Sequence, residues 1–121
     1  HLDEAKVAAE LRVAFGRFVG LMRRNRGWSV EKLANTADVE MSELVTIEED
    51  IHYAPEPSTV HQLATAFSLP AASLMQLAGL TIPKDQRFIQ AAVRFAAKSE
   101  SIAKLTPEER AALDMMVGII N

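Results

Sequence analysis

Cysteine is absent from this chain of 121 residues, and lysine and arginine are absent between Leu33 and Pro83. Without thiols there is no disulfide and no thiolate metal site, a composition that fits a cytoplasmic protein. No apolar run approaches the ~20 residues that a membrane-spanning helix requires. The five glycines occur singly, so the chain offers no glycine-rich loop to cradle a phosphate.

The segment without cations is strongly acidic. Residues 33–83 contain seven carboxylates and therefore carry a formal charge of −7, whereas the whole chain carries −3. Residues 1–32 hold seven cations against four acids, and residues 84–121 hold six against five. A polyanionic partner would therefore have to find its cations outside the middle of the chain.

Apolar residues recur at spacings of three and four through every long segment, which predicts an all-α fold. Start and stop signals place helices at about 3–26, 29–36, 41–48, 58–67, 70–79, 84–98 and 106–120. The clearest start is Thr106-Pro107-Glu108-Glu109, which predicts a capping box. We expect residues 1–80 to form one domain and residues 81–121 to form a C-terminal helical extension.

A series of motifs with regular spacing runs through the middle of the chain. The motifs are Gly27 to Ala34, Ala37-Asp38-Val39, Leu44, Ile47-Glu48 and Pro57 to Val60 with Leu63-Ala64. In residue type, order and spacing they resemble the phage-repressor (Cro/Xre-type) helix-turn-helix family over about residues 15–79. The resemblance implies a five-helix domain, usually a dimeric repressor or an antitoxin, whose third helix enters the DNA major groove.

The resemblance also assigns residues to DNA binding. The family's base-reading positions correspond to Val30, Met41, Ser42 and Thr46. Two of these side chains have no polar group and two have one hydroxyl, so none can make the bidentate contacts of Asn, Gln or Arg. Contacts to the phosphate backbone are expected from Arg17, Arg24, Arg26 and Lys32. Arg23 is excluded from that group, because the family pattern pairs it with Glu48.

Three positions depart from the family pattern. Glu40 replaces the small capping residue of the third helix, and Asp38 and Asp50 replace two glycines. Aspartate accepts a left-handed backbone more readily than most residues, so we expect the fold to be kept. Of the acids in this region, Glu40, Glu43 and Glu49 are expected near phosphates and would oppose DNA binding.

The last predicted helix carries an apolar stripe that needs a surface to cover. In one account the stripe packs back on its own domain. In the other it forms a two-fold interface with a second copy or with a partner. The residues of this interface are Phe88 and Phe95 of the preceding helix, with Leu113, Met116, Val117 and Ile120 of the last helix. We favour dimerisation through them.

No catalytic or metal-binding pattern is recognisable. The serines lack a nucleophile elbow, and His52 and His61 do not have the spacing of metal ligands. We therefore predict no metal, no cofactor and no enzymatic activity. Trp28 is predicted to be a core anchor, and Tyr53 is expected to be exposed in the acidic loop, where it could contact a partner.

Two functions from different classes follow. The first is a transcriptional regulator that binds double-stranded operator DNA as a homodimer and represses its own operon. The second is a protein-interaction module, such as an antitoxin or adaptor that binds a basic protein, for instance a toxin, and has weak or no DNA binding. We place regulation first, because most relatives by this pattern bind DNA.

Overall fold

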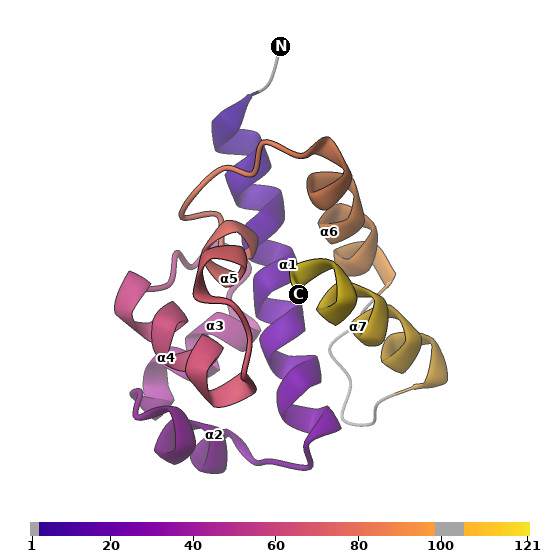
Figure 1. Cartoon of the computed structure of the whole chain (residues 1–121). Coiled ribbons are helices and arrows are strands. Elements are labelled where there is room, and N and C mark those ends of the chain that lie inside the picture. The colour runs from indigo at the N-terminus through magenta and orange to yellow at the C-terminus, as the bar shows by residue number, and fades with distance from the viewer. Residues whose placement is uncertain (1–2, 99–105) are drawn as a thin grey trace.

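The structure is a computed structural model that describes residues 3–98 and 106–121. Its elements are α1 (Glu4–Asn25), α2 (Val30–Ala37), α3 (Met41–Glu49), α4 (Pro57–Phe67), α5 (Ala71–Leu77), α6 (Gln86–Lys98) and α7 (Pro107–Ile120). Figure 1 shows α1 running through the middle of the molecule, with α2 to α5 on one side and α6 and α7 on the other. The predicted all-α class, five helices followed by two, is confirmed.

α1 is the central element, and ten of its 22 residues are buried. The Asp3 side chain caps its first turn by accepting a hydrogen bond from the Lys6 backbone N–H at 3.3 Å. Its fully buried side chains include Leu11, Phe15 and Phe18, and α3, α5, α6 and α7 all pack against it. Burying each such side chain stabilises the fold by about 1.5–3 kcal/mol.

Glycine allows α3 to approach α1 closely. A β-carbon at Gly16 would lie 2.5 Å from the Ile47 carbonyl oxygen, and one at Gly20 would lie 3.3 Å from Glu48 Oε1. Only a residue without a side chain fits the first of these positions without displacing the backbone of α3.

The two aspartates that replace glycines behave differently. Asp38 ends α2 in the left-handed conformation, with φ 57°, as the sequence predicts. Asp50 does not, because its φ is −106° and its backbone is extended. Instead, the Asp50 carboxylate accepts a hydrogen bond from the His52 backbone N–H at 2.9 Å and begins the loop to α4.

Three helices start at residues other than those predicted. α4 begins one residue earlier than predicted, at Pro57, with Glu56 as its N-cap. Pro70 is the N-cap of α5 rather than its first residue. α6 begins at Gln86, two residues later than expected. Within the described ranges, no helix has both the length and the apolar character needed to cross a membrane.

The C-terminal helices pack on α1. The predicted capping box is confirmed, with Thr106 and Glu109 joined by two hydrogen bonds of 3.1 Å. Of the six apolar residues expected to meet a second copy, Val117 is half-buried and five are buried within the chain itself: Phe88, Phe95, Leu113, Met116 and Ile120. Phe95, for example, meets Phe18 of α1 edge to face, with ring centroids 6.1 Å apart. The stripe therefore packs on its own domain, and it is not available to a partner while the core stays closed.

Candidate nucleic-acid interface

α2 and α3 form a helix-turn-helix unit with a partly exposed outer face. Ser29 caps α2 by accepting the Lys32 backbone N–H at 3.0 Å, and Leu44 and Ile47 bury the inner face of α3. On the outer face, Met41 is 49% exposed and Ser42 is also exposed.

The other two predicted base-reading residues are less accessible. Thr46 is half-buried, and its hydroxyl donates a hydrogen bond to the Ser42 carbonyl oxygen at 2.9 Å. Val30 is half-buried at the first residue of α2. The side chains at the start of α3 are therefore the ones best placed to reach a base edge.

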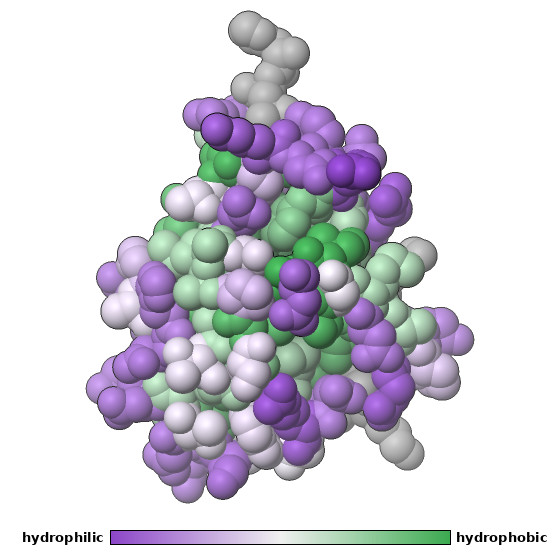
Figure 2. Space-filling view, in the orientation of Figure 1, coloured by the Kyte–Doolittle hydropathy of each residue, from purple (hydrophilic) through white to green (hydrophobic). Residues whose placement is uncertain are grey.

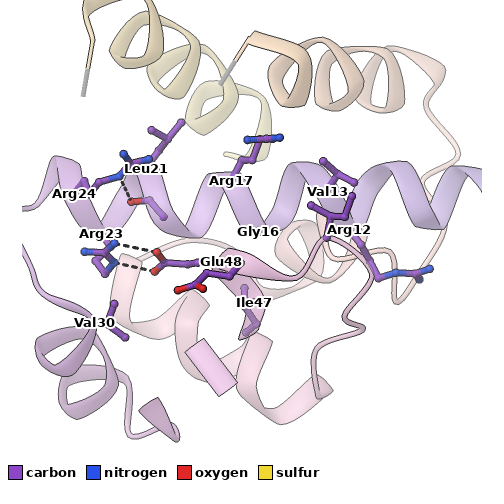
Figure 3. A pocket seen from close by; sticks show the side chains of 13 residues that line it. Arg12, Val13, Gly16, Arg17, Leu21, Arg23, Arg24, Val30, Ile47 and Glu48 are labelled. Atoms are coloured by element: carbon purple, nitrogen blue, oxygen red, sulfur yellow. Dashed lines mark hydrogen bonds and ion pairs between the residues drawn. The ribbon is translucent and has the colours of Figure 1, made fainter. Parts of the chain in front are cut away.

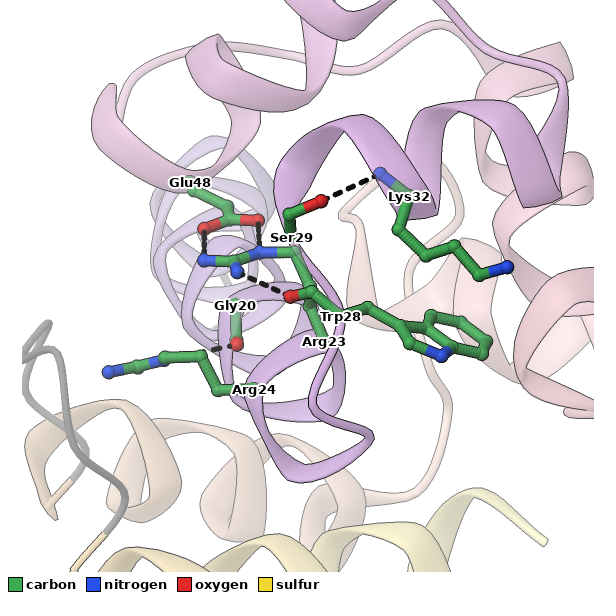
Figure 4. A network of polar contacts seen from close by, with 7 residues as sticks. All are labelled: Gly20, Arg23, Arg24, Trp28, Ser29, Lys32 and Glu48. Atoms are coloured by element: carbon green, nitrogen blue, oxygen red, sulfur yellow. Dashed lines mark hydrogen bonds and ion pairs between the residues drawn. The ribbon is translucent and has the colours of Figure 1, made fainter.

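The predicted pairing of Arg23 with Glu48 is confirmed. Arg23 Nε and Nη2 donate to the two Glu48 carboxylate oxygens at 2.8 and 2.9 Å, and Arg23 Nη1 donates to the Trp28 carbonyl oxygen at 2.9 Å (Figure 4). The hydrogen bond to Glu48 raises the pKa of Arg23, although burial opposes the shift. The pair fixes the angle between α1 and α3, so neither charge is available to a ligand.

Glu43 is an internal hydrogen-bond acceptor. Its carboxylate accepts from the Thr59 hydroxyl at 2.6 Å, from the Tyr53 hydroxyl at 2.9 Å and from the Glu56 backbone N–H at 3.1 Å. It thereby joins α3 to the loop and to the first turn of α4, where the helix dipole favours a negative charge. α4 has no side-chain cap of its own, so Glu43 supplies one from another helix.

This contact corrects the expectations for Glu43 and Tyr53. Glu43 is committed to the fold rather than directed at phosphates, and Tyr53 is half-buried rather than exposed. Burial, followed by the hydrogen bond to Glu43, raises the pKa of Tyr53 to about 12. Tyr53 therefore stays neutral at physiological pH and holds the loop in place.

A groove of about 630 Å³ lies between α1 and the C-terminal half of α3 (Figure 3). Once the Arg23–Glu48 pair is set aside, its charged lining consists of Arg12, Arg17 and Arg24 with Glu49. Figure 3 shows Arg17 and Arg24 on the side of α1 away from α3, so they form an edge of the groove. The groove is thus net positive next to an acidic helix.

Two of these arginines have unused donors. The Nε atoms of Arg12 and Arg17 are buried and have no hydrogen-bond partner within the described part of the chain. Arg24 Nε donates to the Gly20 carbonyl oxygen at 3.2 Å, which holds that side chain along α1. A guanidinium group held along a helix, as that of Arg24 is, can donate to a phosphate with little further ordering.

Arg26 and Lys32 lie outside this groove. The Arg26 guanidinium stacks 5.3 Å from the Trp28 ring and 5.7 Å from the Phe67 ring, and Nη2 donates to the Phe67 carbonyl oxygen at 3.2 Å. Trp28 is half-buried and stacks on Phe67, with ring centroids 6.4 Å apart. Arg26 therefore helps to attach the α1–α2 turn to α4, while Lys32 is exposed on α2.

The structure thus brings together two of the four arginines and lysines expected at phosphates, Arg17 and Arg24. It adds Arg12, which sequence reasoning missed. Arg12 precedes the recognised motifs, so their spacing gave no reason to include it. The available signal was its position on the same helix as Gly16, the residue that α3 approaches most closely.

Residues 16–80 match the family model described as a helix-turn-helix domain. The match begins inside α1 and ends just after α5, and it covers more than half of the chain. Comparisons with curated proteins and with solved structures gave no match. Domains of this kind typically bind DNA and are not enzymes.

Proposed function

Since the chain belongs to the helix-turn-helix domain family, we propose that it is a Cro/Xre-type transcriptional regulator that binds operator DNA as a dimer and represses its own operon. The observation that carries the proposal is the groove edged by Arg12, Arg17 and Arg24 beside α3. The groove places cations beside α3, the helix expected to contact bases, which contains no lysine or arginine.

The acidity of residues 33–83 opposes DNA binding less than the sequence implies. Three of the seven carboxylates, Glu43, Glu48 and Asp50, accept hydrogen bonds inside the fold. Glu49 borders the groove, whose lining also includes Arg12, Arg17 and Arg24. Because DNA affinity depends on counterions released by individual phosphate contacts, the local balance at the groove matters more than the charge of the segment.

Phosphate and base contacts fall to different helices in this proposal. The arginines of α1 hold the backbone and position the domain, which requires no particular sequence. Met41 and Ser42 reach base edges from the start of α3. A methionine can contact the methyl group of thymine but cannot form the hydrogen bonds that distinguish guanine or adenine. We therefore expect modest sequence preference and strong salt dependence.

Salt-titrated fluorescence anisotropy tests the proposal, with duplex DNA from upstream of the protein's own gene and an unrelated duplex of equal length. The double variant Arg17→Gln/Arg24→Gln should lower the affinity about tenfold or more at low salt. It should also reduce the slope of log K against log salt by about 1.8, since each phosphate contact contributes ~0.9.

A matched control removes two cations elsewhere on the surface. Lys84→Gln/Arg87→Gln makes the same change in net charge at exposed positions before and in α6, and it should leave the slope unchanged. Arg17→Lys/Arg24→Lys keeps both positive charges, so it should retain most of the slope of log K against log salt. If no duplex binds the parent protein even at low salt, the regulator assignment is refuted. An equal loss in the control would place the DNA contact outside the groove.

A second candidate function rests on Met41 and Ile51, which are 49% and 48% exposed near the acids of α3. Apolar side chains among carboxylates suit a basic protein partner, as in an antitoxin that binds its toxin directly. Co-purification with the product of the neighbouring gene, abolished by Met41→Asp, would support this function. A Met41→Asp variant that still binds the partner would exclude this surface.

A further inference from the structure

A second groove, of about 490 Å³, lies between α6 and α7 on the part of the molecule away from α2 and α3. Its walls include the small residues Ala91, Ala111 and Ala112, and its floor includes the buried side chains of Phe95 and Met116.

The rim of this groove exposes large apolar side chains. Met115 is 66% exposed and Ile119 is 39% exposed, and they lie one turn apart on α7. Within the described residues, the other exposed large apolar side chains are Met41 and Ile51, beside the proposed DNA face. In Figure 2, hydrophobic surface gathers over the part of the molecule where Figure 1 places the end of α7. An apolar surface of this kind is typical of an interaction site.

The charges on the two walls indicate what covers the groove. Arg94 lies on the α6 wall and Glu108 on the α7 wall, and neither forms an ion pair with another described residue. A two-fold axis that runs along the groove exchanges the two walls. It therefore places Arg94 of each copy opposite Glu108 of the partner subunit, so the surface is complementary to itself.

We propose that the α6–α7 groove binds the same groove of a second copy of this chain. On each side of the axis, Met115 and Ile119 of one copy would be covered by the α6 wall of the partner subunit, next to an Arg94–Glu108 pair. α3 and the arginine-edged groove lie on other elements and would stay accessible to DNA. The proposal rests on the proposed function for its purpose, since it names the surface through which the regulator dimerises.

Sedimentation equilibrium of the whole chain without DNA tests the proposal. The parent protein should have twice the mass of one chain at micromolar concentration. Met115→Asp should have the mass of one chain, with an unchanged helical circular dichroism spectrum because Met115 is mostly exposed. The matched control is Met41→Asp, an exposed methionine of α3, which should remain a dimer.

Charge reversal identifies the pairing. Arg94→Glu and Glu108→Arg should each weaken dimerisation about tenfold or more, because like charges would then face each other across the axis. The double variant Arg94→Glu/Glu108→Arg restores opposite charges and should regain most of the affinity.

A monomeric parent protein, or a dimeric Met115→Asp variant, would overturn the proposal. If Arg94→Glu/Glu108→Arg dimerises no more tightly than the two single variants, the two-fold pairing is overturned. Since no DNA is present, these outcomes are independent of the regulator assignment. A protein that dimerises but binds no duplex would refute the proposed function and leave this interface standing.

Discussion

Replacing Gly16 and Gly118 by alanine should change the stability of the protein in opposite directions. Both glycines lie inside α-helices, where alanine is favoured over glycine by about 0.5–1 kcal/mol. Helix propensity alone would therefore make both substitutions stabilising. Their tertiary surroundings are different.

The space around each glycine indicates whether alanine should raise or lower the free energy of unfolding. A β-carbon at Gly118 would have no heavy atom within 4 Å, so Gly118→Ala should stabilise the fold by about 0.5–1 kcal/mol. At Gly16 the β-carbon would lie 2.5 Å from the Ile47 carbonyl oxygen, which belongs to the backbone of α3 and cannot rotate away. α3 would have to retreat by roughly 1 Å to reach ordinary contact distance. Such overpacking costs about 1–3 kcal/mol, so the net effect of Gly16→Ala should be a loss of roughly 1–2 kcal/mol.

Urea denaturation followed by circular dichroism measures both effects on one scale. Gly16→Ala should lower the midpoint and Gly118→Ala should raise it, with equal slopes for all three proteins. The melting temperature should move by about 4 °C for each kcal/mol. Gly20→Ala should lie between them, since its β-carbon would meet the movable end of the Glu48 side chain at 3.3 Å. If Gly16→Ala proves as stable as Gly118→Ala, the close approach of α1 to α3 is refuted.

Two further predictions concern the polar contacts of α3. Tyr53 is the one tyrosine of the chain, so its ionisation can be followed by ultraviolet absorbance. Because its pKa is raised from 10.0 to about 12, its stabilising effect should be complete below pH 10 and lost as the pH rises through about 12. Glu43→Gln should lower the pKa of Tyr53. A Tyr53 pKa of 10.0 in the folded parent protein would contradict its contact with Glu43. The other prediction concerns the Arg23–Glu48 ion pair. Glu48→Gln should destabilise the fold by about 3 kcal/mol, because it leaves the positive charge of Arg23 without its partner on a side chain that is only 15% exposed. Arg23→Met/Glu48→Met should be less harmful in the same urea assay, whereas a larger loss would show that the ion pair itself supplies the stability.

Features that depend on neighbouring residues or on family spacing were predictable from the sequence. The capping box of α7 requires only Thr106 and Glu109 at a fixed separation, and it forms as predicted. The left-handed turn at Asp38 was predictable because Asp38 replaces a glycine of the family pattern. The Arg23–Glu48 pair spans 25 residues, and it was predictable only because the family pattern links these two positions.

Features that depend on how distant segments meet were not predictable. The three hydrogen bonds of Glu43 involve residues 10 to 16 positions away, and no periodicity joins them. The groove that contains Arg12 exists because Gly16 lets α3 lie against α1, which a single sequence does not reveal. The apolar stripe of α7 was recognised correctly as a contact surface. Its partner, which is α1 and α6 of the same chain, depends on the path of the chain after α5.

The charge of a sequence segment is therefore a poor guide to its ligand when carboxylates have structural roles. Glu48 orients α3 on α1, and Glu43 replaces the missing cap of α4. A lysine or arginine at either position would break a contact that holds α3 in place. The acidity of this segment therefore partly reflects folding rather than function. The cations that a DNA-binding domain needs lie instead on α1, where Arg12, Arg17 and Arg24 line the groove without belonging to α3. Because these arginines are separate from the residues that shape α3, their removal should weaken DNA binding while stability is kept. Loss of Glu43 or Glu48 should instead reduce both together.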